Sequence, residues 1–322
     1  AVQQYSDDKT TTTVVLETAS TDGTTKGAAR AARRLIDDHV VAVIGPQTVK
    51  EADGSGPVLA AAGIPALTAT VTSTSLPISS WPGFLQVVAD DAQQGAAEAD
   101  ELVDTLGRRQ IALVAGTSAG DRARSSAAAT EVTGDGATVA VSTSVTSSGS
   151  VTTAADQVVA SGADGVFISV SPDEAQAVVS ALSVAGFTGS VLLAADATSS
   201  PSVLDGLAAT MSGALVASPA DDTSIGAVDG GAALEFRDTF RAAFGEIPPP
   251  WAAESFDATK FVLAGISAGC TTPALLLNYL QGHDWAGVSS TIQFATGGGQ
   301  LHPHVWVSQA RAGKLVQISE AS

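Results

Sequence analysis

The chain has 322 residues, 45% of them hydrophobic and 15% charged, which is enough apolar material for the packed cores of two domains and excludes a disordered chain. The net charge of −18, without any basic stripe, excludes nucleic acid as a main partner, because phosphate backbones would be repelled. We interpret the acidity as a contribution to solubility, with a cationic ligand as the alternative interpretation.

Short apolar segments alternate with helical ones along most of the chain. A helix is predicted at 24–39 because three alanines and Leu35 fall on one face, and the continuous apolar run at 40–45 is typical of a strand buried on both sides. The elements expected in this first part are a strand at 13–20, a helix at 24–39, a strand at 40–45, a helix at 51–62 and a strand at 64–70.

The alternation starts again after Asp90 and Asp91. The elements expected there are helices at 92–106, 121–133, 153–161 and 173–185, and strands at 110–116, 137–145, 165–170 and 190–196. Strands that alternate with helices in this way indicate parallel α/β sheets with helices on both faces.

The alternation breaks between 213 and 250, where the segment "SPADDTSIGAVDGG" at 218–231 has the composition of a loop. Helices at 232–244 and 252–268 follow, and then strands at 291–294 and 304–309. The restart and the break predict two doubly wound parallel-sheet lobes joined by three hinge crossings. The expected bounds are 1–88 and 219–291 for lobe 1, and 89–218 and 292–322 for lobe 2. No apolar run reaches the roughly 20 residues that a membrane helix needs.

Several segments, taken in order, resemble the branched-chain amino-acid-binding family of ABC importers, which has the type I periplasmic-binding fold. The segments are "DDHVVAVIGPQT", "GPVLAAAGIPALTATVTSTSL", "FLQVVADDAQQG", "IALVAGTSAGD", "SGADGVFISVSPDEAQAVVSALSVAGFTGSVLLAADA", "FDATKFVLAGI" and "VWVSQARAGK". The resemblance implies an extracytoplasmic protein that captures a small molecule between two lobes, an amino acid or a related carboxylate, and passes it to a membrane permease. It implies no enzymatic reaction and no cofactor. A ligand-sensing receptor domain of the same fold is the alternative.

The resemblance also raises an expectation about the N-terminal end. Family members open with a strand and a long helix before the segment "TVVLETAS", whereas residues 1–6 here match only the end of that helix. The strand lies in the middle of the first sheet in the family, and its neighbours would keep unpaired backbone groups without it. We therefore expect an N-terminal strand and helix to be missing from the given chain.

Two loops of lobe 1 are expected to bind the ligand, because ligands of open α/β sheets bind at the carboxyl ends of the strands. Thr48 and Val49 follow the strand at 40–45; the family usually has a small hydroxyl residue where Val49 stands, and Thr48 could take its role. Thr70, Val71 and Thr72 follow the next strand, where the family uses backbone groups and a threonine hydroxyl. Hydroxyl and N–H groups are suited to a ligand carboxylate.

Three positions of lobe 2 are expected to face the ligand. Ala119 and Ser171 stand where the family often has aromatic residues, so the pocket would be larger here. Asp196 follows the strand at 190–196, where the family has an acid that pairs with the ligand ammonium. The alternative for Asp196 is an N-cap for the helix expected after Ser200.

The segment "GTSAG" at 116–120 matches the nucleophile elbow G-x-S-x-G of α/β-hydrolases, with Ser118 as the nucleophile. Asp196 and either His302 or His304 follow in the order of a hydrolase triad. We favour a ligand-facing turn over this esterase, since the motif is short, the chain is rich in glycine, alanine and serine, and no "HGG" segment precedes it. Two histidines without a third ligand do not indicate a metal site, so neither a metal nor a catalytic residue is expected.

Overall fold

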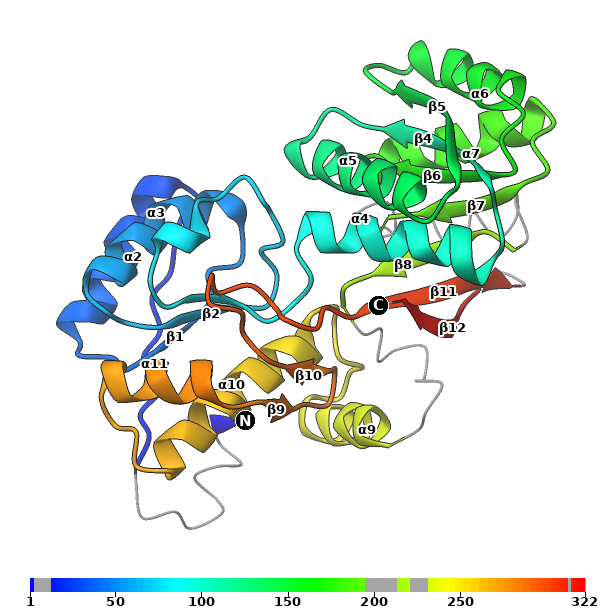
Figure 1. Ribbon diagram of the computed structural model, residues 1–322. Helices are drawn as coiled ribbons and strands as arrows, with labels where there is room; N and C mark the ends of the chain where they lie inside the picture. The colour runs from blue at the N-terminus through cyan, green and yellow to red at the C-terminus, as the bar shows by residue number, and fades with distance from the viewer. Residues whose placement is uncertain (3–12, 195–212, 221–230, 312–313, 322) are drawn as a thin grey trace. The chain divides into compact units, whose positions relative to one another are not determined.

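The computed structural model describes residues 1–2, 13–194, 213–220, 231–311 and 314–321, and the chain divides into two compact units (Figure 1). Unit 1 comprises residues 1–90 and 231–302, and unit 2 comprises residues 91–230 and 303–322. The chain passes between the units three times. The second and third passages come after Gly230 and His302, later than the predicted lobe bounds at 218 and 291.

Unit 1 contains a parallel sheet with the strand order β1-β2-β3 and helices packed around it. Helix α2 packs against α3, and α10 contacts α11 and the strands β1 and β2. The elements are α2 (Thr25–Asp37), β1 (Val43–Ile44), α3 (Val49–Ala61), β2 (Ala66–Thr68), the 3-10 turn η1 (Ile78–Ser80), β3 (Phe84–Gln86), α9 (Ala232–Phe244), α10 (Ala252–Ser267), α11 (Pro273–Gly282) and the antiparallel pair β9 (Trp285–Ala286) and β10 (Thr291–Ile292).

The apolar core of unit 1 is centred on Phe261 of α10, which is fully buried. Its ring stacks against Trp285 at 5.8 Å and against Phe294 at 6.1 Å between centroids. Asp257, one turn earlier on α10, accepts hydrogen bonds from the N–H groups of Val288 and Ser289, both at 2.8 Å. These contacts fix the β9–β10 hairpin on the helix.

The strand predicted at 13–20 is wrong: the described residues of this segment form neither helix nor strand. A strand exists only where a neighbour accepts its backbone hydrogen bonds, and β1 lies at the edge of the described sheet, paired with β2 alone. The segment leaves Val15 and Leu16 exposed, at 72% and 66%. An apolar cavity of about 880 Å³ lies beside it, lined also by β1, α2, α9 and α10.

Unit 2 contains a seven-stranded sheet with the order β12-β11-β8-β7-β6-β4-β5. The strands from β5 to β8 are parallel, and β11 runs antiparallel to β8 and β12. The elements are α4 (Asp91–Asp100), a π-helical turn η2 (Glu101–Thr105), β4 (Gln110–Ala115), α5 (Ala119–Gly134), β5 (Thr138–Ser144), α6 (Ser150–Ala160), β6 (Gly165–Ser169), α7 (Pro172–Val184), β7 (Ser190–Leu193), β8 (Leu215–Ser218), β11 (Val305–Arg311) and β12 (Lys314–Ala321).

Helices cover both faces of the unit 2 sheet, as the sequence predicted (Figure 1). On one face α6 and α7 pack on alternate strand residues such as Ala112, Val166 and Val191. Because side chains alternate along a strand, Leu113 and Phe167 point to the opposite face, where α4 and α5 pack together. The mixed α/β class with mainly parallel sheets is therefore confirmed. Among the described residues, the structure shows no helix that is long and apolar enough to cross a membrane.

Candidate ligand-binding site

The strand order of unit 2 reverses at β4. The chain leaves β4 to form β5 on one side of it and then returns to form β6 on the other side. The connections after β4 and β6 therefore leave the sheet in opposite directions, and the crevice at such a switch point is where open α/β sheets bind ligands. The residues that border this point are Gly116–Ser118, after β4, and Val170–Ser171, after β6. Ala119 and Ser171, both exposed, are the predicted site residues found here.

An acidic residue in the first helical turn fixes each of these two loops. Ser118 is the N-cap of α5: its hydroxyl accepts from the N–H of Asp121 at 3.0 Å, and Asp121 Oδ2 accepts from the N–H of Ser118 at 3.1 Å. At α7, the Glu174 carboxylate accepts from the N–H of Ser171 at 3.2 Å and from its hydroxyl at 2.7 Å. These bonds satisfy the N–H groups of Ser118, Asp121 and Ser171, and they tie each loop to the first turn of its helix.

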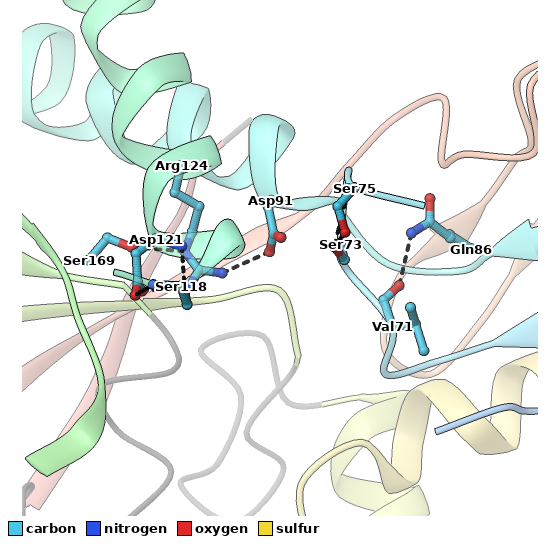
Figure 2. Close-up of polar contacts among 9 residues, drawn as sticks. All are labelled: Val71, Ser73, Ser75, Gln86, Asp91, Ser118, Asp121, Arg124 and Ser169. Atoms are coloured by element: carbon cyan, nitrogen blue, oxygen red, sulfur yellow. Dashed lines mark hydrogen bonds and ion pairs between the residues drawn. The ribbon is translucent and has the colours of Figure 1, made fainter. Parts of the chain in front are cut away.

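A buried arginine lies directly beneath the β4–α5 loop (Figure 2). Arg124 is 1% exposed, and its guanidinium contacts Asp91 Oδ1 at 2.8 Å, Ser169 Oγ at 3.1 Å and Asp121 Oδ1 at 3.5 Å. Space for this arrangement depends on Gly116, because a Cβ atom there would lie 2.5 Å from Asp121 Oδ2. The polar cluster is buried, so it supports the loop from inside the unit, and the exposed residues above it are Ser118 and Ala119.

Two loops of unit 1 are tied to each other by threonine hydroxyls. Thr68, the last residue of β2, donates to the carbonyl of Pro46 at 2.8 Å, and Thr70 donates to the carbonyl of Gln47 at 2.7 Å. The Thr68 hydroxyl also accepts from the N–H of Val71 at 3.1 Å. The loops that follow β1 and β2 therefore form one surface at the carboxyl edge of the unit 1 sheet.

Gln86 supports this surface from below. It ends β3 and is 1% exposed, and its amide nitrogen donates to the carbonyl of Val71 at 2.9 Å (Figure 2). The Val71 side chain is also buried, at 1% exposed, so both its side chain and its backbone groups contribute to the loop itself. Half-buried Thr70 and Thr72 remain as the side chains of this loop that a ligand can approach.

Thr48 is the N-cap of α3 and forms a capping box with Glu51. Its hydroxyl accepts from the N–H of Glu51 at 3.3 Å and donates to Glu51 Oε2 at 3.1 Å. Hydrogen bonds from the hydroxyls of Thr21 and Thr48 hold the pKa of Glu51 below its ordinary value, against the opposing effect of burial. Glu51 is therefore ionised at neutral pH, and a ligand carboxylate at Thr48 would meet its negative charge.

The structure thus groups the predicted residues unit by unit. Thr48, Val49, Thr70, Val71 and Thr72 lie on the two joined loops of unit 1. Ala119 and Ser171 lie at the switch point of unit 2. Asp196 lies outside the described residues, as does the helix that it was alternatively expected to cap.

The sequence interpretation missed the residues that support these loops, which are Glu51, Gln86, Asp91, Asp121, Glu174 and Arg124. A signal for three of them was present, because each loop ends in a serine or threonine followed three residues later by an acid. This spacing is the sequence mark of a capping box. Nothing local marked Arg124 or Gln86 as buried.

Among the described residues, the bonding of Ser118, His302 and His304 gives the hydrolase arrangement no support. The Ser118 hydroxyl serves as a helix cap. His304 Nδ1 is hydrogen-bonded to Glu320 on the neighbouring strand β12, and His302 is exposed. The Ser118 hydroxyl and His304 Nδ1 are thus each engaged in local structure.

A cluster of carboxylates lies elsewhere in unit 2, where α4 and α5 end side by side. Asp100, Glu131 and Asp135 are half-buried, and their carboxylate oxygens lie within 4.8 Å of one another. Burial, a hydrogen bond with Asp135 and the charge of Glu131 raise the pKa of Asp100 to about 7. Below neutral pH, Asp100 therefore carries a proton, which it shares with Asp135 through their hydrogen bond, so repulsion between the carboxylates is relieved there.

Comparison with known proteins identifies the family of this chain. A family model described as periplasmic binding protein matches residues 5–314. The chain belongs to this family. A search of curated proteins gave no match.

Solved structures place this periplasmic binding protein in the type I fold, as the sequence resemblance predicted. A structure assigned to a branched-chain amino acid ABC transporter of Rhodospirillum rubrum has a TM-score of 0.86 at 20% identity, over 98% of this chain and 92% of the other. A substrate-binding protein of Desulfitobacterium hafniense, in complex with Leu, has a TM-score of 0.82 at 18% identity, over 98% and 92%. A solute-binding protein of an ABC transporter from R. palustris, in complex with benzoate, has a TM-score of 0.74 at 16% identity, over 100% of this chain and 89% of the other.

Proposed function

We propose that this periplasmic binding protein captures a small solute outside the cytoplasm and delivers it to the membrane permease of an ABC importer. The family match over residues 5–314 carries this proposal. The loops at the carboxyl edges of both sheets support it, because they present exposed hydroxyl and backbone groups on rigid caps. Binding and release require no bond to be made or broken, so no catalytic group is assigned.

The ligand that we propose is an amino acid or a related carboxylate. Structural neighbours were solved with Leu and with benzoate, which share a carboxylate. The Thr70 hydroxyl donates to the carbonyl of Gln47, so the Thr72 hydroxyl is the donor that we propose for the carboxylate. Both residues lie one loop away from the capping box of Glu51. We therefore assign the carboxylate to the Thr70–Thr72 loop and not to Thr48, whose hydroxyl is engaged by ionised Glu51.

The other end of the ligand is proposed to lie at the switch point of unit 2. Ala119 and Ser171 are small, which leaves room for a side chain larger than that of leucine, and Asp196 would pair with an ammonium group. An aromatic carboxylate without ammonium would not need Asp196. Comparison of the two ligand types therefore tests the role of Asp196 directly.

A thermal-shift screen with L-leucine, L-phenylalanine, benzoate, a small amide and L-lysine tests the proposal. A ligand present at a hundred times its Kd stabilises the native state by about 2.7 kcal/mol and must raise the Tm. We expect a shift with at least one carboxylate. A shift with L-lysine alone would narrow the proposed class to a cationic amino acid. A shift with the small amide alone, or no shift with any compound, would contradict the proposed ligand class.

Calorimetric titration of variants then locates the ligand. Thr72→Ala should weaken binding by about 1 kcal/mol, the usual loss for one neutral hydrogen bond. Asp196→Ala should weaken the binding of an amino acid by roughly 2–5 kcal/mol and leave benzoate unaffected. Thr130→Ala, on the exposed face of α5, is the matched control and should change the affinity for neither the amino acid nor benzoate. Unchanged affinity in both site variants would place the ligand elsewhere.

A further inference from the structure

Arg124 is a charged side chain withdrawn almost completely from solvent, at the ligand edge of the unit 2 sheet. It projects from the second turn of α5 and is 1% exposed. Its three contacts reach three separate elements. These are the first residue of α4, through Asp91, the end of β6, through Ser169, and the first turn of α5, through Asp121.

Two of these contacts continue to the loops on either side of the switch point. Asp121, which faces Arg124 through Oδ1, accepts from the N–H of Ser118 through Oδ2. Ser169 is the last residue of β6, and its carbonyl accepts from the N–H of Gly116 at 2.7 Å. Through Asp121 and Ser169, Arg124 is therefore linked to both ends of the 116–118 loop and to the strand that leads to Ser171 (Figure 2).

The two buried carboxylates of the cluster need the positive charge of Arg124 to keep this arrangement. Asp91 and Asp121 are both buried, and the guanidinium is within 3.5 Å of both. A buried carboxylate without a cation takes up a proton or draws in water. Either change would weaken the hold of Asp121 on the N–H of Ser118, because a protonated or hydrated carboxyl is a poorer acceptor.

We propose that Arg124 is a positioning residue that sets the conformation of the 116–118 loop and thereby the place of Ala119 relative to Ser171. The inference deepens the proposed function, since these residues are the unit 2 part of the candidate ligand site. Arg124 itself is enclosed and does not touch the ligand. Its planar fork is needed, because it contacts Asp91 and Ser169 at the same time.

Hydrogen exchange of the ligand-free protein tests the loop directly. Arg124→Met keeps the apolar stem and removes the charge, and Leu182→Ala is the matched control, because it destabilises unit 2 from the core on the other face of the sheet. The two variants are compared at temperatures that give them the same global stability. We expect the amide of Ser118 to exchange about tenfold faster in Arg124→Met than in Leu182→Ala, since its acceptor is weakened.

Two milder variants keep the test decisive if Arg124→Met does not fold. Ser169→Ala removes one of the three contacts, and Arg124→Lys keeps the charge but loses the fork. Both should accelerate the exchange of the Ser118 amide by a smaller factor than Arg124→Met, in the same segment. Equal protection of 116–118 in Leu182→Ala and in all folded Arg124 and Ser169 variants would overturn the proposal.

Titration with L-leucine separates this inference from the proposed function. If L-leucine binds the wild type, its Kd should rise about tenfold in Arg124→Met and stay unchanged in Leu182→Ala under folding conditions, because only the first alters the loop. An unchanged Kd in Arg124→Met would overturn the positioning role. If L-leucine does not bind the wild type, the titration uses a carboxylate that shifts the Tm in the thermal screen. If no carboxylate binds, the proposed ligand class fails, and the exchange experiment still decides the role of Arg124.

Discussion

Replacing Gly95 by alanine tests how closely α4 and α5 approach each other behind the candidate site. A Cβ atom at Gly95 would lie 2.2 Å from the carbonyl oxygen of Arg124 and 2.7 Å from its Cα. Both atoms belong to the backbone of α5, so no flexible side chain can move aside. The two helices must separate, or the residue must strain, and either change disturbs the buried cluster around Arg124.

The expected loss of stability is the difference of two opposing effects. Overpacking of a close contact costs about 1–3 kcal/mol, at the upper end where backbone meets backbone. Alanine regains up to about 1 kcal/mol through its higher helix propensity. The net loss is therefore about 2 kcal/mol, which lowers the Tm of a unit of this size by roughly 4–8 °C.

Differential scanning calorimetry measures this change, with Gly134→Ala as the matched control. Gly134 is the last residue of α5, and a Cβ atom there would have no other atom within 4 Å. We expect Gly134→Ala to leave the Tm unchanged or slightly higher, while Gly95→Ala lowers it. A Gly95→Ala protein as stable as the wild type would refute the close approach of the two helices.

Three further predictions concern single polar residues. Asp100→Asn should raise the Tm at pH 8 and change it little at pH 4. The pKa of Asp100 is raised to about 7 in the native state. Its contribution to the stability of the fold is therefore present below the ordinary pKa of an aspartate and is lost as the pH rises through 7. A larger gain at pH 4 would contradict the shared proton. Asp257→Ala should cost roughly 3 kcal/mol in urea unfolding, because buried donors of the β9–β10 hairpin lose their acceptor. Ser118→Ala should lower stability by about 1 kcal/mol through loss of a helix cap and leave p-nitrophenyl ester turnover unchanged; a large loss of turnover would restore the esterase.

Local periodicity was sufficient for most of the helices and for five of the seven strands in the unit 2 sheet, which are β4, β5, β6, β7 and β11. The predicted helix at 232–244 has the bounds of α9, and the predicted strand at 110–116 differs from β4 by one residue. Helix α11 and the strands β3, β8, β9 and β12 were not predicted. The restart of the alternation after Asp91 coincides with the first residue of unit 2.

Several features depended on which segments meet in space, and these the sequence could not supply. The 13–20 segment has a strand-like pattern, yet a strand forms only beside a partner, and β1 pairs with β2 alone. Thr48 has the residue type of a ligand contact, but its hydroxyl is engaged by Glu51. Arg124 has the residue type of an exposed helix face, and it is buried because Asp91 and Ser169 converge on it.

The sequence by itself determined the alternation of strands and helices, because this depends on residues within a few positions of each other. The capping boxes at the three βα loops are equally local, although they were not predicted. The tertiary structure alone decided the strand order, and with it the switch point where Ala119 and Ser171 are found. It also decided that Asp91, from the start of α4, pairs with Arg124 of α5. These contacts join segments tens of residues apart, and their energies depend on distance and burial, which no local pattern encodes.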